Sequence, residues 1–138
     1  MPAKDLYHNS VRNVLIKDGW TITHDPLRLK WGTKDMYVDL GAEQLLGAEK
    51  TGRQIAVEIK SFVGASEMDD FEKAIGQYII YRSVMTRTEP DRMLYLAIHN
   101  EAFLDIFEEP LGKLLLEDHQ VGLIVYDIQA EVILKWIP

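Results

Sequence analysis

The fold is decided by ten consecutive residues near the middle of the chain, Arg53-Gln54-Ile55-Ala56-Val57-Glu58-Ile59-Lys60-Ser61-Phe62. Every second residue from Ile55 to Ile59 is a large aliphatic, and this period of two predicts a β-strand. The same period places Glu58 and Lys60 on one face of the strand. An acidic and a basic side chain therefore share one face of the predicted sheet.

A second predicted strand, residues 36–40, carries Asp39. A neighbouring strand can bring Asp39 beside Glu58, and two adjacent carboxylates repel each other unless a hard cation such as Mg²⁺ binds between them. A lysine at such a site can hold an attacking water or stabilise charge on a phosphate, while the metal acidifies the water. The pattern favours phosphodiester hydrolysis. In the alternative interpretation, Glu58 and Lys60 form an exposed ion pair and Asp39 is an ordinary strand-end residue. Glu-x-Lys by itself is too common to decide between the two.

The length and composition of the chain limit what it can be. Its 138 residues, 47% of them hydrophobic and 27% charged, suffice for one core and predict a single folded domain over residues 1–138. No apolar run is long enough to cross a bilayer, and the first five residues lack the apolar stretch of a signal peptide. The absence of cysteine excludes disulfides and thiolate metal sites. We expect a cytoplasmic protein.

The net charge of −7 argues against a nucleic-acid-binding protein, because affinity for nucleic acid normally rests on Lys and Arg side chains that neutralise phosphates. A partner would then have to supply the basic surface. Basic residues do cluster in two places, in the predicted loop before the second strand and late in the predicted long helix: Arg28, Lys30, Lys34, Arg82 and Arg87. These residues could line one edge of a site or form a solvated face.

The order of the predicted elements is helix, strands, helix, strand. Residues 5–17 have helical spacing, and Asp18-Gly19 ends that helix. Ser66 opens a long helix with a capping-box-like pattern, and we expect the helix to end near Thr86. The other elements are strands at 20–23, 36–40, 44–49, 53–62, 93–98, 122–126 and 132–136, a loop around Pro26, a turn at Lys50-Thr51-Gly52, and a helix at 101–117 broken near Pro110. The simplest fold is an α/β domain with a mixed sheet and antiparallel edges.

The αβββαβ order and the spacing of Asp39, Glu58 and Lys60 resemble the PD-(D/E)XK nuclease-like superfamily, which includes many restriction enzymes. This resemblance implies a restriction-endonuclease-like αβββαβ core with a mixed central sheet flanked by helices. Longer stretches resemble the cyanobacterial XisH family: residues 4–13, 15–20, 30–32, 35–43, 56–62, 76–82 and 132–138. The XisH resemblance implies a factor that controls excision of the fdxN DNA element, beside a site-specific recombinase and a small XisI-like protein.

Two classes of function follow from these resemblances. The first is an endonuclease-like enzyme that hydrolyses phosphodiester bonds in DNA with Mg²⁺ or Mn²⁺. The second is a non-catalytic accessory or partner-binding protein that keeps the nuclease fold within a recombination complex.

The superfamily resemblance also implies roles for individual residues. Asp39 and Glu58 would bind the metal, with the backbone carbonyl of Ile59 as a further ligand, and Lys60 would be the catalytic lysine. Asp35 is a rival to Asp39, but its position after Trp31-Gly32 is typical of a turn residue.

Three more residues belong to this candidate site. Gln77 and Tyr81 match a Gln-x-x-x-Tyr element of RecB-like and λ-exonuclease-like nucleases. Their spacing puts both on one helical face, where the amide and the phenol could orient the metal cluster or touch DNA. Alternatively, Tyr81 is half-buried core and Gln77 satisfies nearby backbone. His8 stands where many relatives have a glutamate. It either ligates the metal or is a satisfied histidine at the edge of the core, since imidazole suits softer ions than Mg²⁺.

The remaining expectations concern partners and excluded activities. The apolar run at residues 132–137 could pair at a sheet edge, so we expect a homo-oligomer. Trp31, between Lys30 and Gly32, either packs or meets a ligand. The chain has no Gly-x-Ser-x-Gly motif and no phosphate-cradling glycine loop, so nothing points to acyl transfer or nucleotide hydrolysis.

Overall fold

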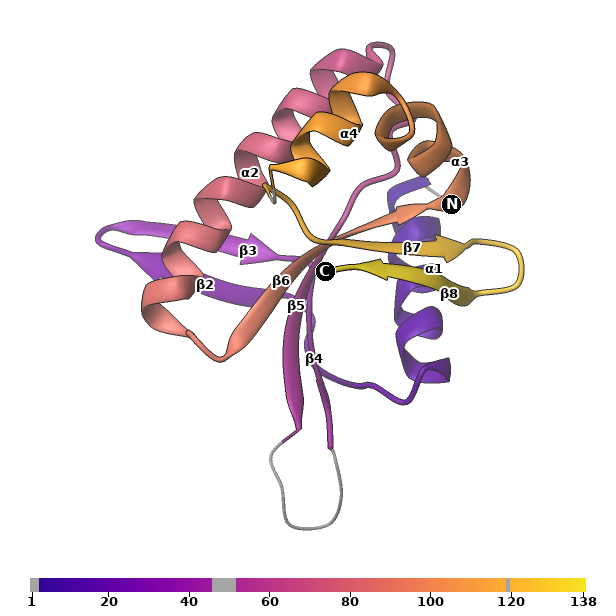
Figure 1. The fold of residues 1–138 in the computed structure, drawn as a ribbon. Coiled ribbons are helices and arrows are strands. Elements are labelled where there is room, and N and C mark those ends of the chain that lie inside the picture. Colours follow the sequence, from indigo (N-terminus) through magenta and orange to yellow (C-terminus); the bar gives the residue numbers. More distant parts are fainter. Residues whose placement is uncertain (1–2, 46–51, 119) are drawn as a thin grey trace.

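A mixed sheet of six strands runs through the centre of the molecule in the order β1-β4-β5-β6-β7-β8 (Figure 1). The computed structural model describes residues 3–45, 52–118 and 120–138. The strands β5, β6 and β7 pair in parallel, whereas β1, β4 and β8 add antiparallel pairs on the two sides. Their bounds are β1 Thr21–His24, β4 Leu40–Gln44, β5 Arg53–Ile59, β6 Arg92–His99, β7 Leu123–Asp127 and β8 Val132–Ile137. The predicted mixed α/β sheet with antiparallel edges is confirmed.

Two helices cover opposite faces of this sheet, α1 (Ala3–Lys17) and α2 (Glu67–Thr88). The alternation in β5 explains the arrangement, because successive side chains point to opposite faces. Ile55 and Val57 pack in the α1 cluster, whereas Ala56 packs with Tyr78 of α2. Glu58 follows the parity of Ala56, so it faces α2. No helix within the described residues is long and apolar enough to cross a membrane.

The start of α2 follows the predicted cap. The hydroxyl of Ser66 accepts a hydrogen bond from the backbone N–H of Asp69 at 3.2 Å, which satisfies one of the free donors of the first turn. Acidic residues in that turn stabilise the helix, because their negative charge interacts favourably with the positive end of the helix dipole. The helix continues two residues beyond the expected end at Thr86, to Thr88.

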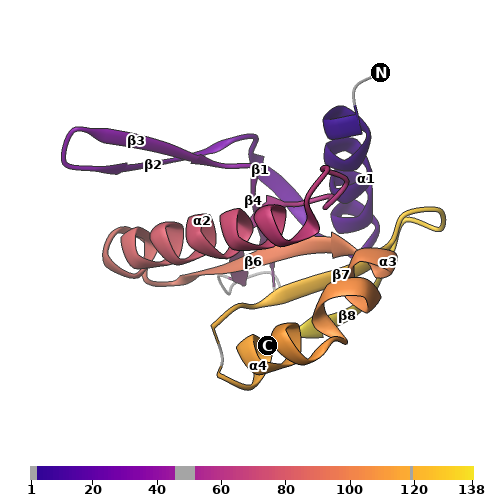
Figure 2. The ribbon, with the colours of Figure 1, turned by 90° about the horizontal axis from the view of Figure 1, so that it is seen from above.

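One prediction around Pro26 was wrong. The expected loop is a β-hairpin made of β2 (Leu27–Trp31) and β3 (Lys34–Val38), and it forms a separate two-stranded sheet. Figure 2 shows it extending alongside α2 and away from α1. The inward side chains Leu27 and Leu29 are buried in the cluster under α2, and this tertiary contact stabilises the strand. Their alternation with Arg28 and Lys30 was the available signal for it.

The expected strands 36–40 and 44–49 were also placed wrongly. The first is divided at Asp39 between β3 and β4, and β4 itself spans Leu40–Gln44. The expected residues 46–49 and the turn residues Lys50 and Thr51 lie outside the described residues. The strand expected to end at Phe62 ends at Ile59, and Phe62 adopts a left-handed backbone with φ 55°.

The predicted helix after β6 is three elements. These are α3 (Asn100–Ala102), the π-helix η1 (Phe103–Phe107) and α4 (Pro110–Glu117). The predicted break near Pro110 is confirmed, because this proline occupies the first turn of α4, where its missing N–H costs nothing. The π-helix was not expected.

Tyr78 connects α2 to two strands, and its removal tests the packing of this layer. Its hydroxyl donates to the carbonyl of Leu94 and accepts from the N–H of Gly122, both at 2.9 Å. Tyr78→Phe leaves both buried backbone groups without this partner, so we expect the free energy of unfolding to fall by about 1–3 kcal/mol. Urea denaturation measures this change. The control Tyr37→Phe removes a hydroxyl from a half-exposed ring and should stay within about 0.5 kcal/mol of wild type. Equal losses of stability in the two variants would contradict the prediction.

Candidate functional site

A cavity of about 670 Å³ opens between the first half of α1, the first half of α2 and the end of β5. Its lining brings together residues that are far apart in the sequence, among them Asp39, Glu58, Lys60 and Gln77. The strand β5 delivers Glu58 and Lys60, β4 begins directly after Asp39, and α2 supplies Gln77. Four of the five residues that were predicted to carry the chemistry therefore face one cavity.

Asp39 and Glu58 lie opposite each other across two antiparallel strands. The ladder pairs Leu40 with Val57, so the next pair outward is Asp39 with Glu58, and directly opposed residues share a face. The backbone N–H of Asp39 donates to Glu58 Oε1 at 3.2 Å, and the N–H of Ile59 donates to Asp39 Oδ2 at 2.8 Å. These two hydrogen bonds hold the carboxyl groups beside one another.

Lys60 completes the group on the same side of the strand, as the period of two predicts. Its Nζ lies 3.5 Å from Glu58 Oε2. Glu58 is only 5% exposed, while Lys60 keeps part of its surface open toward the cavity. The ion pair is therefore not the exposed surface pair of the alternative interpretation.

The buried position changes the proton affinity of Glu58. Burial raises its pKa, the charge of Asp39 raises it further, and the ammonium of Lys60 lowers it in part, which leaves the pKa at about 7 instead of 4.5. The nearby carboxylates also contribute to a raised pKa of Tyr81, after burial as the main cause. At neutral pH Glu58 is therefore protonated in part of the molecules. A divalent cation that binds between the two carboxylates could replace this proton.

Three residues of α2 stand one turn apart along the side that faces the site. Gln77 lines the cavity, and its Oε1 is buried with no hydrogen-bond partner within the described part of the chain. Tyr81 does not line the cavity, but it lies close enough to both carboxylates for their charges to contribute to its raised pKa. Lys73 lines the cavity and was not predicted. Its position four residues before Gln77 was the available signal, because i, i+4 residues share a helical face.

His8 reaches the same cavity but already has a partner. Its Nε2 lies 2.8 Å from Asp25 Oδ1, and Asp25 also pairs with Arg12. Whether the other ring nitrogen ligates a metal stays a prediction. Asp35 pairs with Arg28 at 2.9 Å on the hairpin and is not part of the cavity lining, so the geometry favours Asp39 over its rival.

The donor set fits a hard divalent cation. Asp39 and Glu58 offer carboxylate oxygens beside Ile59. Gln77 Oε1 is a buried acceptor that receives no hydrogen bond from the described residues. Mg²⁺ typically takes one or two carboxylates and keeps several waters, so two protein carboxylates are sufficient. Within the described ranges there is no group of three or more His, Cys, Asp and Glu side chains that could hold a metal.

The elements α1, β1, β4, β5, α2 and β6 follow the αβββαβ order, with the β2–β3 hairpin inserted after the first strand. This order defines a mixed α/β protein with the predicted αβββαβ core, which carries a carboxylate pair and a lysine at the end of its central strand. The chain belongs to the XisH family, since the sequence model described as XisH protein matches residues 1–134.

Two solved structures are similar over nearly the whole chain. An XisH family protein from Nostoc punctiforme is 38% identical, with a TM-score of 0.88 over 97% of this chain and 100% of that one. A fdxN element excision controlling factor protein from Anabaena variabilis is also 38% identical, with a TM-score of 0.86 over 97% and 99% of the two chains. No curated protein matches the sequence. The expected family and fold are thus confirmed.

Proposed function

We propose that this protein is an excision controlling factor that acts on DNA through a metal-dependent, phosphodiester-hydrolysing site. The observation that carries the proposal is the placement of Asp39 and Glu58 side by side, with Lys60 against them, in one open cavity. The description of the similar Anabaena variabilis protein as a fdxN element excision controlling factor supports DNA as the substrate.

Each residue has a distinct part in this proposal. Asp39 and Glu58 would hold Mg²⁺ or Mn²⁺ together with the carbonyl of Ile59. The bound metal would acidify a water and polarise a phosphoryl oxygen. Lys60 presents a cation to the phosphate as charge develops on it, and burial on one side strengthens that electrostatic effect. The amide of Gln77 supplies an acceptor that can orient a water, and Lys73 adds a second cation at the rim.

A second candidate is an accessory factor that keeps the fold without hydrolysis. The net charge of −7 favours it, as does His8 at a position where the superfamily resemblance implies a glutamate. In this role the protein would work beside an XisI-like small protein and a site-specific recombinase. The edge strand β8, with its exposed Val132 and Leu134, would be available for pairing with a second copy.

Metal binding to the native site is the first test. We expect Mn²⁺ at about 100 times its Kd to stabilise the wild type by about 2.7 kcal/mol, seen as a rise in Tm, because a ligand that binds only the folded state shifts the equilibrium by mass action. Asp39→Asn should lose most of this rise. The matched control is Asp35→Asn, which removes the same charge from the hairpin outside the cavity and should keep the rise. A rise that is equal in all three proteins would contradict the proposed metal site.

A further inference from the structure

The β2–β3 hairpin, residues 27–38, is basic in an acidic protein. It carries Arg28, Lys30 and Lys34 against Asp35, which gives +2. The whole chain carries −7, so the remaining residues together carry −9. A local excess of positive charge favours contact with phosphates.

The two faces of the hairpin have different chemistry. The register pairs Leu27 with Val38 and Leu29 with Met36, and these side chains pack in the cluster under α2. Arg28 and Lys30 occupy the opposite, exposed face, where Asp35 is the cross-strand partner of Lys30. Lys34 pairs with Trp31 at the exposed tip and has the parity of the apolar face. The apolar face therefore fixes the hairpin to the body, and the basic face is left to solvent.

The basic face continues directly into the cavity. Tyr37 is the cross-strand partner of Arg28, and Tyr37 lines the cavity together with Lys60 and Lys73. A line of exposed side chains thus leads from the candidate metal site through Tyr37 and Arg28 to Lys30. Arg28 is partly neutralised by Asp35 at 2.9 Å. Lys30 and Lys34 make no ion pair with any residue in the described ranges.

The tip of the hairpin ends in an aromatic side chain. Trp31 is 53% exposed, and the turn that follows it begins at Gly32 with φ 61°, as the first position of a type II′ turn requires. Trp20 is buried, and Trp136 packs against it with ring centroids 5.8 Å apart. Of the three tryptophans, which all lie within the described residues, Trp31 is the most exposed.

We propose that the hairpin is an arm that binds the backbone of duplex DNA. Lys30, on one face, and Lys34, beside Trp31 on the other face at the tip, would contact phosphates. The choice of DNA rests on the proposed function, because the arm starts at the candidate phosphodiester site. A five-residue strand spans about 17 Å, and a two-stranded ribbon fits the major groove, which is about 12 Å wide. The arm would let a protein of net charge −7 bind DNA directly, without a basic partner.

Removal of the two lysine charges tests this arm. The variant is Lys30→Gln with Lys34→Gln, and binding of a fluorescein-labelled duplex is followed by anisotropy over a series of salt concentrations, with Mn²⁺ and with EDTA. The variant should bind more weakly, and the slope of log K against log salt should fall by about 2, because each lysine that neutralises a phosphate contributes about one unit to that slope.

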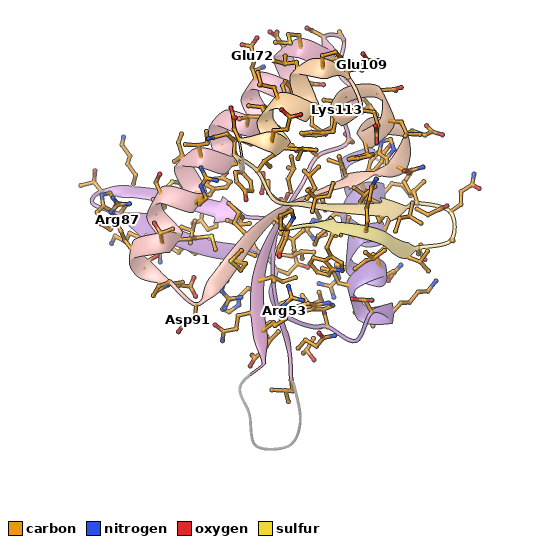
Figure 3. The ribbon with its side chains drawn as sticks, in the orientation of Figure 1. Arg53, Glu72, Arg87, Asp91, Glu109 and Lys113 are labelled. Atoms are coloured by element: carbon orange, nitrogen blue, oxygen red, sulfur yellow. The ribbon has the colours of Figure 1, made fainter. Side chains whose placement is uncertain are left out.

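The matched control carries Lys17→Gln and Lys113→Gln, which remove the same charge from α1 and α4. Both lysines are exposed, and Figure 3 shows Lys113 on α4, away from the hairpin. The control should keep the wild-type salt slope. Equal slopes in the two double variants, or no duplex binding by the wild type at low salt, would overturn the proposal.

The arm and the metal site can fail separately. The hairpin variant should keep the Mn²⁺-dependent rise in Tm, whereas Asp39→Asn should lose that rise and keep the lysine-dependent salt slope. Loss of the Mn²⁺ effect in the wild type with an intact slope would reject the proposed metal site and retain the arm.

Trp31 gives an independent readout. Acrylamide should quench the fluorescence of this exposed tryptophan in the free protein, and duplex DNA should protect it. Unchanged quenching on addition of duplex would contradict the arm. Equal or better protection by poly-glutamate at the same charge concentration would show that the hairpin takes an acidic protein partner instead of DNA.

Discussion

Lys60→Ala is expected to reduce metal-dependent cleavage of duplex DNA by at least about 100-fold, the usual effect of removing one group that stabilises transition-state charge. The Nζ of Lys60 lies 3.5 Å from Glu58 and faces the cavity, so its loss removes the cation nearest to the carboxylate pair. The measurement is single-turnover nicking of supercoiled plasmid with Mg²⁺ or Mn²⁺. Lys113→Ala, on the exposed surface of α4, should cleave like the wild type.

The same experiment separates the two classes of function. If the protein is an accessory factor, the wild type will not nick the plasmid at any metal concentration. Cleavage that Lys60→Ala leaves unchanged would reject the mechanism and point to a contaminating nuclease.

The second large effect is on the pH dependence of stability. The pKa of Glu58 is about 7 in the folded protein and 4.5 as a free side chain, so between these values the folded state holds a proton that the unfolded state has released. Stability therefore falls as pH rises from about 4.5 to about 7, by about 3 kcal/mol in total, and does not fall further above that window. Glu58→Gln cannot release a proton, so its stability should lack this fall.

Urea unfolding of metal-free protein at pH 5 and pH 8 measures this effect. The loss of stability between the two pH values should be about 2.5 kcal/mol larger in the wild type than in Glu58→Gln, because part of the total fall already lies below pH 5. Glu101→Gln, an exposed residue of α3, should behave like the wild type. A wild type and Glu58→Gln that lose equal stability would show that Glu58 titrates at its ordinary pKa.

Much of the carboxylate site could be predicted from sequence because it depends on local periodicity. The period of two fixed the shared face of Glu58 and Lys60, and one antiparallel partner strand sufficed to bring Asp39 to them. The family resemblance extended the site to Gln77. The roles of all four in chemistry stay predictions.

The features that were missed depend on contacts across the fold. The strand β2 is an exception, because its alternation of Leu27 and Leu29 with Arg28 and Lys30 was a local signal; burial of the two leucines under α2 stabilises it. The pairing of His8 with Asp25 joins residues 17 positions apart, and nothing in the local pattern indicates it. Periodicity cannot distinguish the π-helix at Phe103–Phe107 from an α-helix. Arg82 was grouped with the basic residues, but it donates to the carbonyl of Gln120 at 2.8 Å, beside the strand β7.

Asp39 is the single residue between the last residue of β3 and the first of β4, so the hairpin and the central sheet meet at it. Its backbone N–H donates a hydrogen bond to Glu58, and its carboxylate accepts one from the N–H of Ile59. A ligand that reorients the hairpin must therefore act on the carboxylate pair through one peptide unit. Thermodynamic reciprocity then requires that any factor by which such a ligand changes metal affinity is the factor by which the metal changes affinity for that ligand. If a ligand on the hairpin shifts the junction at Asp39, this residue couples the hairpin to the metal site, with no need for a longer path through the protein.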